Sequence, residues 1–332
     1  MGRDLDIVTG GAGFIGSHLV DLLISQRRHV LAIDNLAVGR QSNLAQHTGN
    51  PNFRFEQADV RDRAAMKALL AGADRVFHLA ALADIVPSVQ NPEAYFDTNV
   101  NGSYAVAEAA RAAGVRRLVY AASSSCYGIP DCYPTPEDAA IQPQYPYALT
   151  KYLGEQVLLH WAKVYDLPIV SLRFFNVYGP RARTSGTYGA VFGVFLAQKL
   201  SGKPLTVVGD GKQTRDFTYV ADVADAILAA AERGRTGEIY NVGSGNTVSV
   251  NRLVELIGTE RVEHLPKRPG EPDCTFADIT KITRDLGWQP RVAIEEGVAR
   301  MMQHLDHWRD APVWTPDSIA EATKDWFKYL GK

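Results

Sequence analysis

Short apolar runs rich in β-branched residues alternate with longer segments in which apolar positions recur every three to four residues. The short runs predict strands over 5–9, 30–33, 53–56, 75–79, 118–122 and 169–174, and the longer segments predict helices from about 14, near 63–70, near 92–113 and near 145–165. Such β-α-β alternation is typical of a parallel sheet with helices on both faces and ligands at the carboxyl ends of its strands. The pattern predicts an α/β fold with a Rossmann-type, doubly wound parallel sheet.

The second half of the chain has a different pattern. Beyond Asn176, proline and glycine become frequent and the apolar runs shorten. A helical pattern over 219–231 and a strand pattern over 238–242 still resemble the elements of the first half. We therefore expect the chain to cross back into the first domain over these residues. We predict a dinucleotide-binding domain at 1–175 plus about 217–242, and a smaller, interleaved C-terminal substrate-binding domain at 176–216 and 243–332.

Composition narrows the class of protein. The 332 residues include 35 basic and 37 acidic ones, which give a formal net charge of −2, and no long run of like charge occurs. Long-range attraction to nucleic acid or to an anionic membrane is therefore not expected. Three cysteines lack metal-ligand spacing, and no signal segment or stretch of 18 apolar residues is found. We expect a cytoplasmic protein without a metal.

A glycine-rich loop follows the first predicted strand and opens the first predicted helix. Gly10 permits a tight turn, Gly13 permits close approach of the backbone to a pyrophosphate, and Gly16 permits close packing of the helix on the sheet. The helix N-terminus offers free N–H groups and the positive end of its dipole to the phosphates. This strand-loop-helix context predicts a dinucleotide site.

Asp34, at the end of the second strand, indicates which dinucleotide binds. A carboxylate there accepts hydrogen bonds from the adenosine ribose and repels a 2′-phosphate, which favours NAD over NADP. Arg40 lies nearby in the sequence and leaves NADP open. Asp59, which closes the third strand, is expected near the adenine amino group.

Tyr147 and Lys151 are four residues apart in a predicted helix and therefore share one face. Lowering the pKa of a tyrosine from 10 to about 7 needs on the order of 4 kcal/mol. A unit charge at about 4 Å supplies roughly that amount at an effective dielectric near 20. A run of serines, Ser123 to Ser125, follows a strand upstream and offers a hydroxyl for the reacting oxygen. Together these residues predict a general base with its cation and hydroxyl partner.

These motifs resemble the extended short-chain dehydrogenase/reductase family, in particular its UDP-galactose 4-epimerase-like members. The resemblance runs from Thr9 to about Pro290 and is carried by the glycine loop, 34–36, 78–81, 99–102, the serine run, Tyr147 with Lys151, 173–181, 209–217 and 268–272. It implies that Ser123, four residues before a Tyr-Gly pair, is the catalytic hydroxyl beside Tyr147 and Lys151. A lysine that some members use on the pyrophosphate is replaced by Ala83.

The resemblance also implies two sets of binding residues. The expected NAD-binding residues are Gly10, Gly13, Phe14, Ile15, Asp34, Asn35, Gly39, Asp59, Val60, Leu79, Ala80, Ala81, Asn99, Ala121, Tyr147, Lys151 and Phe174. The expected UDP-sugar-binding residues are Ser125, Asn176, Val191 with its neighbour Ala190, Leu205, Arg215, Arg268, Glu271 and Thr275. Arg215 and Arg268 would meet the two phosphate charges.

The implied activity is NAD-dependent inversion of carbon 4 of a UDP-hexose through a transient 4-keto sugar. Dehydratases of the family have an Asp-Glu pair where this chain has Ser124 and Ser125, which argues against a dehydratase or a decarboxylase. Those activities and the epimerisation of UDP-uronic acids remain alternatives. A catalytically silent NAD-binding protein would be expected to have lost Tyr147 or Lys151.

Thr275 corresponds by its spacing from Arg268 to a position beside the sugar where some relatives have a bulky tyrosine. Its small size suggests that the N-acetylated pair, UDP-GlcNAc and UDP-GalNAc, is accepted besides UDP-Glc and UDP-Gal. The resemblance further implies a homodimer in which the helices near 92–113 and 145–165 of each subunit pair into a four-helix bundle.

Overall fold

The computed structural model describes residues 4–182, 191–259 and 261–331. Its centre is a seven-stranded parallel sheet in the order β11-β6-β5-β4-β1-β2-β3. The strands are β1 (Leu5–Thr9), β2 (His29–Asp34), β3 (Phe53–Gln57), β4 (Arg75–His78), β5 (Arg117–Ser123), β6 (Ile169–Phe174) and β11 (Ile239–Val242). The predicted α/β class with a doubly wound parallel sheet is confirmed.

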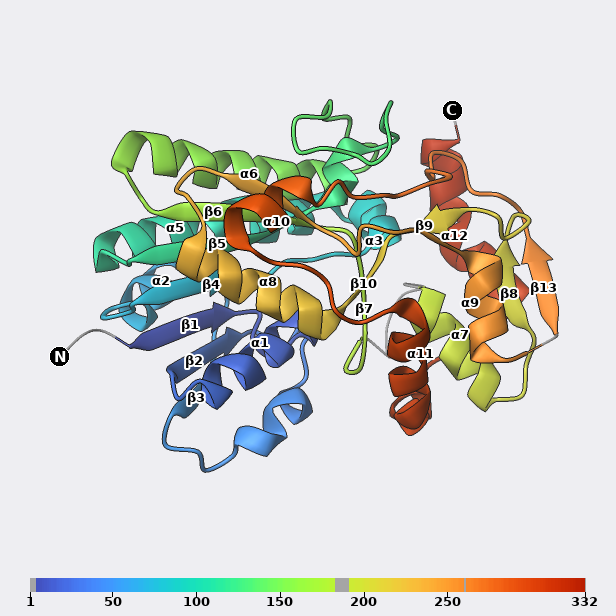
Figure 1. Ribbon diagram of the computed structural model, residues 1–332, viewed down its shortest axis with the longest axis horizontal. Coiled ribbons are helices and arrows are strands. Elements are labelled where there is room, and N and C mark those ends of the chain that lie inside the picture. Colours follow the sequence, from blue (N-terminus) through green and yellow to red (C-terminus); the bar gives the residue numbers. More distant parts are fainter. Residues whose placement is uncertain (1–3, 183–190, 260, 332) are drawn as a thin grey trace.

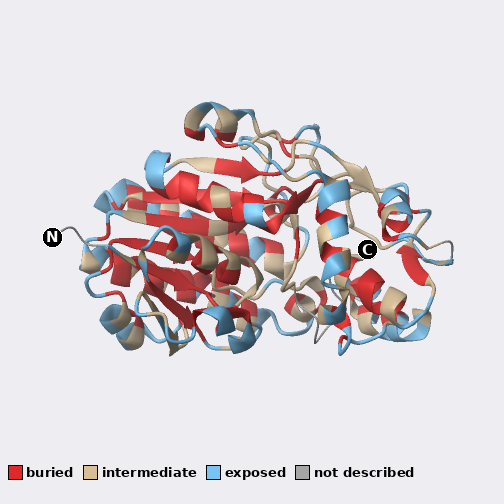
Figure 2. Ribbon diagram, turned by 60° about the horizontal axis from the view of Figure 1, so that its bottom comes forward, coloured by how far each residue is buried: buried red, intermediate tan, exposed pale blue. Residues whose placement is uncertain are grey.

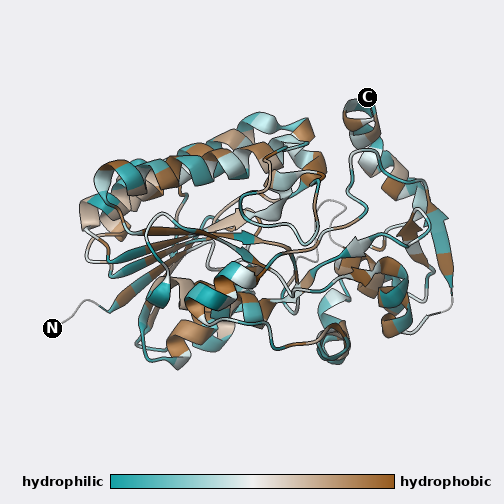
Figure 3. Ribbon diagram, turned by 45° about the horizontal axis from the view of Figure 1, so that its top comes forward, coloured by the Kyte–Doolittle hydropathy of each residue, from teal (hydrophilic) through white to brown (hydrophobic). Residues whose placement is uncertain are grey.

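Helices cover both faces of the sheet (Figure 1). One face packs against α1 (Phe14–Ser25), α8 (Val220–Arg233) and α10 (Thr280–Leu286), and the other against α2 (Arg63–Leu69), α5 (Gly102–Ala113) and α6 (Pro146–Tyr165). Figure 3 shows the largely hydrophobic strands between the two helical layers, and Figure 2 shows that they are buried. Burial on both faces explains why these strands read as nearly continuous apolar runs.

The helical run predicted over 92–113 is divided by a π-helical turn. It consists of α4 (Pro92–Phe96), the turn η2 (Asp97–Asn101) and α5. The turn contains the buried Asn99, whose side-chain nitrogen donates to the Leu82 carbonyl at 3.0 Å and to the Thr150 hydroxyl at 3.1 Å. The wider turn thereby ties the loop after β4 to α6. Other short elements of this half are η1 (Gln41–His47), α3 (Ile85–Gln90) and η3 (Ser124–Tyr127).

The remaining elements form a smaller part beside the carboxyl ends of the strands (Figure 1). They are β7 (Asn176–Tyr178), α7 (Val191–Leu200), β8 (Leu205–Val208), β9 (Thr214–Arg215), β10 (Phe217–Tyr219), β12 (Val248–Ser249), α9 (Val250–Ile257), β13 (Val262–Leu265), α11 (Ile294–Gln303), η4 (Leu305–Trp308) and α12 (Pro316–Leu330). These strands pair two by two, as β7 with β10, β8 with β13 and β9 with β12.

The chain passes between the two parts more than once. After β10 it returns to the sheet through α8 and β11, and β11 pairs with β6. The domain boundaries derived from the sequence stay a prediction. Among the described residues, no helix is both long enough and apolar enough to span a membrane.

Candidate active site

A cleft of about 540 Å³ lies at the carboxyl ends of the strands and extends to the smaller part. In a doubly wound sheet this is where ligands bind, because β1 and β4 lead their chains in opposite directions there. The predicted site residues that line the cleft are Phe14, Ile15, Ser123, Ser125, Tyr147, Phe174, Asn176, Val191, Arg215, Arg268, Glu271 and Thr275. Ala190 lies outside the described residues.

The glycine loop is held between β1 and the loop after β4. Gly10 has a φ of 70°, and a Cβ there would lie 2.7 Å from the backbone nitrogen of Ala80. A Cβ at Gly16 would lie 2.1 Å from the carbonyl oxygen of Gly10. A side chain at either position would therefore push the loop away from the sheet or from the helix. The first turn of α1 stays close to the sheet with its N–H groups directed at the loop.

Asp34 supports the predicted ribose contact. Its side-chain oxygens accept from the backbone N–H groups of Ala12 at 3.1 Å and Leu36 at 2.8 Å, and they lie beside the glycine loop. A Cβ at Gly39 would lie 2.7 Å from one of these oxygens, so a side chain at this position would clash with the carboxylate. Burial raises the pKa of Asp34, partly offset by the N–H groups. A hydroxyl-bearing ligand would satisfy the remaining lone pairs, which fits NAD.

The other predicted cofactor residues surround this loop. The carboxylate of Asp59 is bound by the guanidinium of Arg61 at 2.8 Å and by the amide of Asn35 at 2.9 Å. The hydrogen bonds from Arg61 hold the pKa of Asp59 well below its usual range. The buried Val60 follows it. Leu79, Ala80 and Ala81 continue from β4, and Ala121 lies in β5. Their contacts with NAD stay predictions.

Helix α6 brings Tyr147 and Lys151 under the cleft. The helix begins directly before them, with Tyr145 as N-cap and Pro146 in the first turn, where a missing N–H costs nothing. The hydroxyls of Ser123 and Ser125 interact with the Tyr147 phenol and counteract part of the effect of burial on its pKa. The oxygens of the two serines lie 2.8 Å apart. The phenol of Tyr147 and the hydroxyls of Ser123 and Ser125 therefore lie together, and Lys151 follows one turn further along α6.

The electrostatics of this group differ from the simple expectation that Lys151 lowers the pKa of the tyrosine. Burial raises the pKa of Tyr147, and burial lowers the pKa of Lys151 to about 7. The ammonium lies over the ring of Tyr120, 4.3 Å from the centroid. In the protein without ligand, desolvation is the largest effect on both groups, and it disfavours both the phenolate and the ammonium.

Sequence reasoning did not identify the acidic partner of Lys151. Glu155, one turn further along α6, raises the pKa of Lys151. It is fully buried and bound to the Arg173 guanidinium at 2.7 Å and to the Ser171 hydroxyl at 2.7 Å. The four-residue spacing from Lys151 to Glu155 is the signal that could have found it. Asp84 was also missed; it lines the cleft, and its charge raises the pKa of Tyr147.

Two arginines and a glutamate occupy the far end of the cleft. Arg215 donates to one carboxylate oxygen of Glu271 at 2.8 Å, and Arg268 lies 3.8 Å from the other. One carboxylate thus lies between two guanidinium groups, which leaves one net positive charge for an anionic ligand. Glu271 was expected to bind the UDP-sugar; its carboxylate already interacts with both arginines, and its contact with a ligand stays a prediction.

Asn176 and Thr275 form a hydrogen-bonded pair on the cleft wall. Thr275 donates its hydroxyl to the side-chain oxygen of Asn176 at 2.8 Å, so the amide nitrogen of Asn176 can donate toward a ligand. Thr275 is fixed because its backbone N–H donates to the carbonyl of Thr214. The side chain of Leu205, one of the expected UDP-sugar-binding residues, is fully buried in the core of the smaller part, so its contact with a ligand stays a prediction that only its backbone could fulfil. Its strand neighbours Thr206 and Val208 line the cleft instead.

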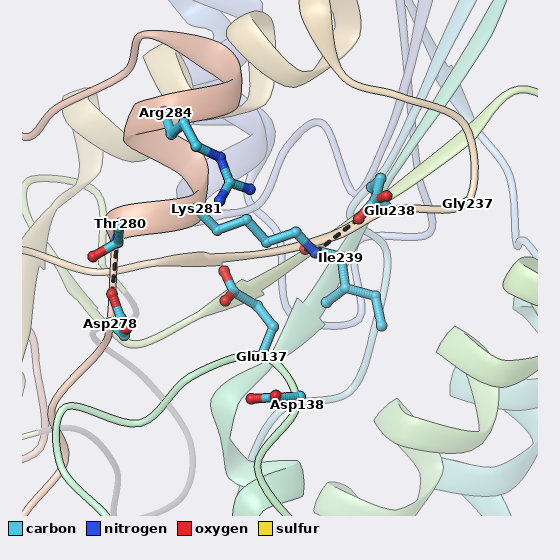
Figure 4. Close-up of a pocket in the computed structure, with 9 residues that line it drawn as sticks. All are labelled: Glu137, Asp138, Gly237, Glu238, Ile239, Asp278, Thr280, Lys281 and Arg284. Atoms are coloured by element: carbon cyan, nitrogen blue, oxygen red, sulfur yellow. Dashed lines mark hydrogen bonds and ion pairs between the residues drawn. The ribbon is translucent and has the colours of Figure 1, made fainter.

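A second cavity, of about 450 Å³, lies away from this cleft between β11, α10 and the segment around Glu137 (Figure 4). Lys281 lines this cavity, and its ammonium group binds the carboxylate of Glu238 at 2.8 Å and the Ile239 carbonyl at 2.7 Å. Glu137 accepts from the backbone N–H of Asn241 at 2.8 Å. These contacts hold the segment against the sheet. In residues 4–182, 191–259 and 261–331, no three His, Cys, Asp or Glu side chains are placed to bind a metal ion.

Comparison with known proteins agrees with this geometry. A sequence model of the NAD dependent epimerase/dehydratase family matches residues 7–243. The UDP-glucose 4-epimerase of Mycolicibacterium smegmatis is 39% identical over 305 residues, which cover 90% of this chain and 97% of that protein. The UDP-glucuronate 4-epimerase of Thermodesulfobacterium geofontis is 35% identical, with coverage of 89% and 94%. UDP-glucuronic acid decarboxylase 4 of Arabidopsis thaliana is 33% identical, with coverage of 90% and 67%.

Solved structures share the fold at similar identity. The UDP-glucose 4-epimerase of Thermotoga maritima, with UDP-glucose, has a TM-score of 0.84 and 36% identity and covers 92% of this chain and 98% of its own. The UDP-glucuronic acid 4-epimerase of Bacillus cereus, in complex with UDP-glucuronic acid and NAD, has a TM-score of 0.85 and 32% identity, with coverage of 91% and 99%. The matched length, the glycine loop and the shared fold show that the chain belongs to the NAD dependent epimerase/dehydratase family, as an NAD-dependent enzyme of the extended short-chain dehydrogenase type.

Proposed function

We propose that the protein inverts carbon 4 of a UDP-hexose, with NAD as a cofactor that is regenerated in each turnover. The observation that carries this proposal is the placement of Tyr147 and Ser123 in one cleft, between the glycine loop and the arginine pair. A nucleotide sugar that extends from the arginine pair to Tyr147 would place its diphosphate at the arginines and its sugar at the tyrosine.

NAD, held by the glycine loop and Asp34, would supply the hydride acceptor and donor for carbon 4 of the sugar. Tyr147 takes the proton of the sugar 4-hydroxyl at its phenolic oxygen, and the hydroxyl of Ser123 stabilises the reacting oxygen by a hydrogen bond. Lys151 stabilises the negative charge that forms on Tyr147. The 4-keto sugar then turns within the cleft and presents its other face, and Tyr147 returns the proton.

Charge in the cleft favours neutral hexoses over uronic acids. The carboxylate of Asp84 lines the cleft and acts on Tyr147. A sugar carboxylate on carbon 5, next to the carbon that reacts, would enter the same field and be repelled. The hydroxyls of Ser124 and Ser125 offer no acid for the expulsion of a sugar hydroxyl, which argues against a dehydratase.

The space beside Thr275 extends the proposed substrates to the N-acetylated pair. A threonine that lines the cleft leaves room for a 2-acetamido group while the sugar turns. We propose UDP-Glc and UDP-Gal as substrates, together with UDP-GlcNAc and UDP-GalNAc.

Product analysis tests the proposal. The purified protein is incubated separately with UDP-Glc, UDP-GlcNAc, UDP-glucuronic acid and dTDP-Glc, and the products are resolved by chromatography and mass. We expect 4-epimers of unchanged mass from UDP-Glc and UDP-GlcNAc. A product that has lost water would identify a dehydratase instead, and a product that has lost carbon dioxide would identify a decarboxylase. Turnover of UDP-glucuronic acid alone would overturn the argument from Asp84.

A homodimer completes the proposal. Helices α4 and α6 expose large apolar side chains, namely Phe96, Leu149, Val164 and Tyr165, each at least 44% exposed. Pairing these helices with their copies would cover them. Sedimentation velocity should give a dimer whose mass does not change from low to high micromolar concentration, and Leu149→Glu should weaken it. A monomer at all concentrations would contradict this part of the proposal.

A further inference from the structure

Helix α12 lies outside residues 7–243, which match the family model, yet it contributes to the substrate cleft. A Thr315-Ser318 capping box fixes its start. The helix packs against α3, which follows β4, and the amide of Gln90 donates to the Asp325 carboxylate at 2.9 Å. Because Trp326 of this helix lines the cleft, the C-terminal part of the chain returns to the cleft.

The residue of α12 that reaches the cleft is Trp326. It is 5% exposed, and its ring lies 6.4 Å from that of Tyr145, the N-cap of the catalytic helix. Its indole N–H donates to the carbonyl of Pro269 at 2.7 Å. One side chain thus contacts both the start of α6 and the segment that carries Arg268 and Glu271.

The indole face also lies against the guanidinium of Arg268. The central carbon of that group is 5.4 Å from the ring centroid, within the range of a cation–π interaction. Arg268 is thereby held between Trp326 on one side and the carboxylate of Glu271, 3.8 Å away, on the other. An arginine held in this way loses less rotamer freedom when it binds an anion than one that projects into solvent.

We propose that Trp326 is a positioning residue for the nucleotide diphosphate, which it affects through Arg268. This inference rests on the proposed function, because it takes the diphosphate of a UDP-sugar as the ligand of Arg268. It predicts that loss of the indole weakens ground-state binding and leaves the proton transfer at Tyr147 nearly unchanged.

The test is a double-mutant cycle on the NAD-loaded enzyme, with UDP as the calorimetric probe. Trp326→Leu should weaken UDP binding about 10-fold in the wild-type background. In the Arg268→Ala background it should weaken binding by less than about 2-fold, because the group on which it acts is gone. Trp326→Phe keeps an aromatic face and should recover most of the affinity. The exposed neighbour Phe327 gives the control, Phe327→Leu, which should change nothing.

Steady-state kinetics with UDP-Glc provide the second measurement. Trp326→Leu should raise KM about 10-fold with kcat within about 2-fold of the wild-type value. Equal weakening of UDP binding in both backgrounds, or a fall in kcat at unchanged KM, would overturn the positioning role. If the wild-type enzyme epimerises UDP-Glc and the Trp326 variants bind UDP normally, only this inference is wrong. If the wild-type protein binds no UDP, the proposed function is wrong as well.

Discussion

Thr275 donates its hydroxyl to the side-chain oxygen of Asn176 across 2.8 Å, although the two residues lie 99 positions apart. Thr275 therefore has two roles. Its hydroxyl orients the Asn176 amide, and its small side chain leaves space in the cleft. Substitution with tyrosine should remove the space. We predict that Thr275→Tyr lowers kcat/KM at least 10-fold more for UDP-GlcNAc than for UDP-Glc, because only the larger substrate needs the volume.

The matched control for this prediction is Thr275→Val, which keeps the volume and removes the hydrogen bond. It should lower kcat/KM for both substrates by the same factor, roughly 2- to 10-fold. Steady-state assays with the two UDP-sugars measure both effects. Equal losses with Thr275→Tyr on both substrates would mean that Thr275 does not determine specificity.

Tyr147→Phe tests the assignment of the base. The change removes the phenolic oxygen and leaves the arginine pair intact, so kcat should fall by several orders of magnitude while the affinity for UDP changes less than about 3-fold. Ser123→Ala should lower kcat by about 10²-fold. Near-normal turnover by Tyr147→Phe would exclude the proposed mechanism.

The pKa of Lys151 predicts how stability depends on pH. Burial lowers this pKa from 10.5 to about 7, so between these values the unfolded chain binds more protons and this residue makes stability rise with pH. Lys151→Met removes the effect. The variant should gain most stability over the wild type below pH 7, and the gain should shrink by about 1.4 kcal/mol per pH unit above it.

Urea denaturation of the NAD-free proteins at pH 6, 8 and 9 measures this difference. Lys163, in the last turn of the same helix and exposed, gives the control variant Lys163→Met. Its stability difference from the wild type should not depend on pH in this range. If the stability difference between Lys151→Met and the wild type were also independent of pH, burial would not lower the pKa of Lys151.

Retention of the cofactor tests the role of Asp34. A cofactor regenerated within each turnover has no need to dissociate, so protein purified without added nucleotide should contain NAD or NADH, released by acid and measured by absorbance. Asp34→Ala should lower NAD affinity about 10- to 100-fold, as expected for the loss of hydrogen bonds to a charged group. Asp34→Asn keeps an acceptor and should lose less. Recovery of NADP would contradict the assignment.

Local patterns predicted the elements of the sheet and the strand-loop-helix geometry around Gly10. Each of these depends on a few consecutive residues, as in the strand, glycines and helix around Gly10, or on a single helix face, as for Tyr147 and Lys151. The contacts that hold charged side chains in place within the site depend on the tertiary fold. The pair of Glu155 with Arg173 and the stack of Trp326 on Arg268 join residues with no shared local pattern.

The sequence did not indicate how deeply the side chains of Tyr147 and Leu205 are buried. The pKa of Tyr147 is raised, because desolvation of the phenol outweighs the hydrogen bonds from Ser123 and Ser125. Leu205 faces the core of the smaller part, because side chains alternate along β8 and its neighbours face the cleft. The amphipathic spacing of Ile319, Thr323 and Trp326 in α12 was present in the sequence and would have indicated a packed helix.

The position of α10 determines what can fold as an independent unit. Ile282 and Leu286 of this helix, with Trp288 after it, belong to the same buried core as α1 and α8, although the match to the family ends at residue 243. The indole of Trp288 also donates to the carbonyl of Asp222 in α8. A chain cut after residue 243 would keep the family's sequence signature and expose the apolar faces that α10 covers. Autonomous folding of the sheet with its helices therefore requires the chain at least as far as Trp288, and a chimera with a single crossover after residue 243 would join one part of this core to a foreign α10.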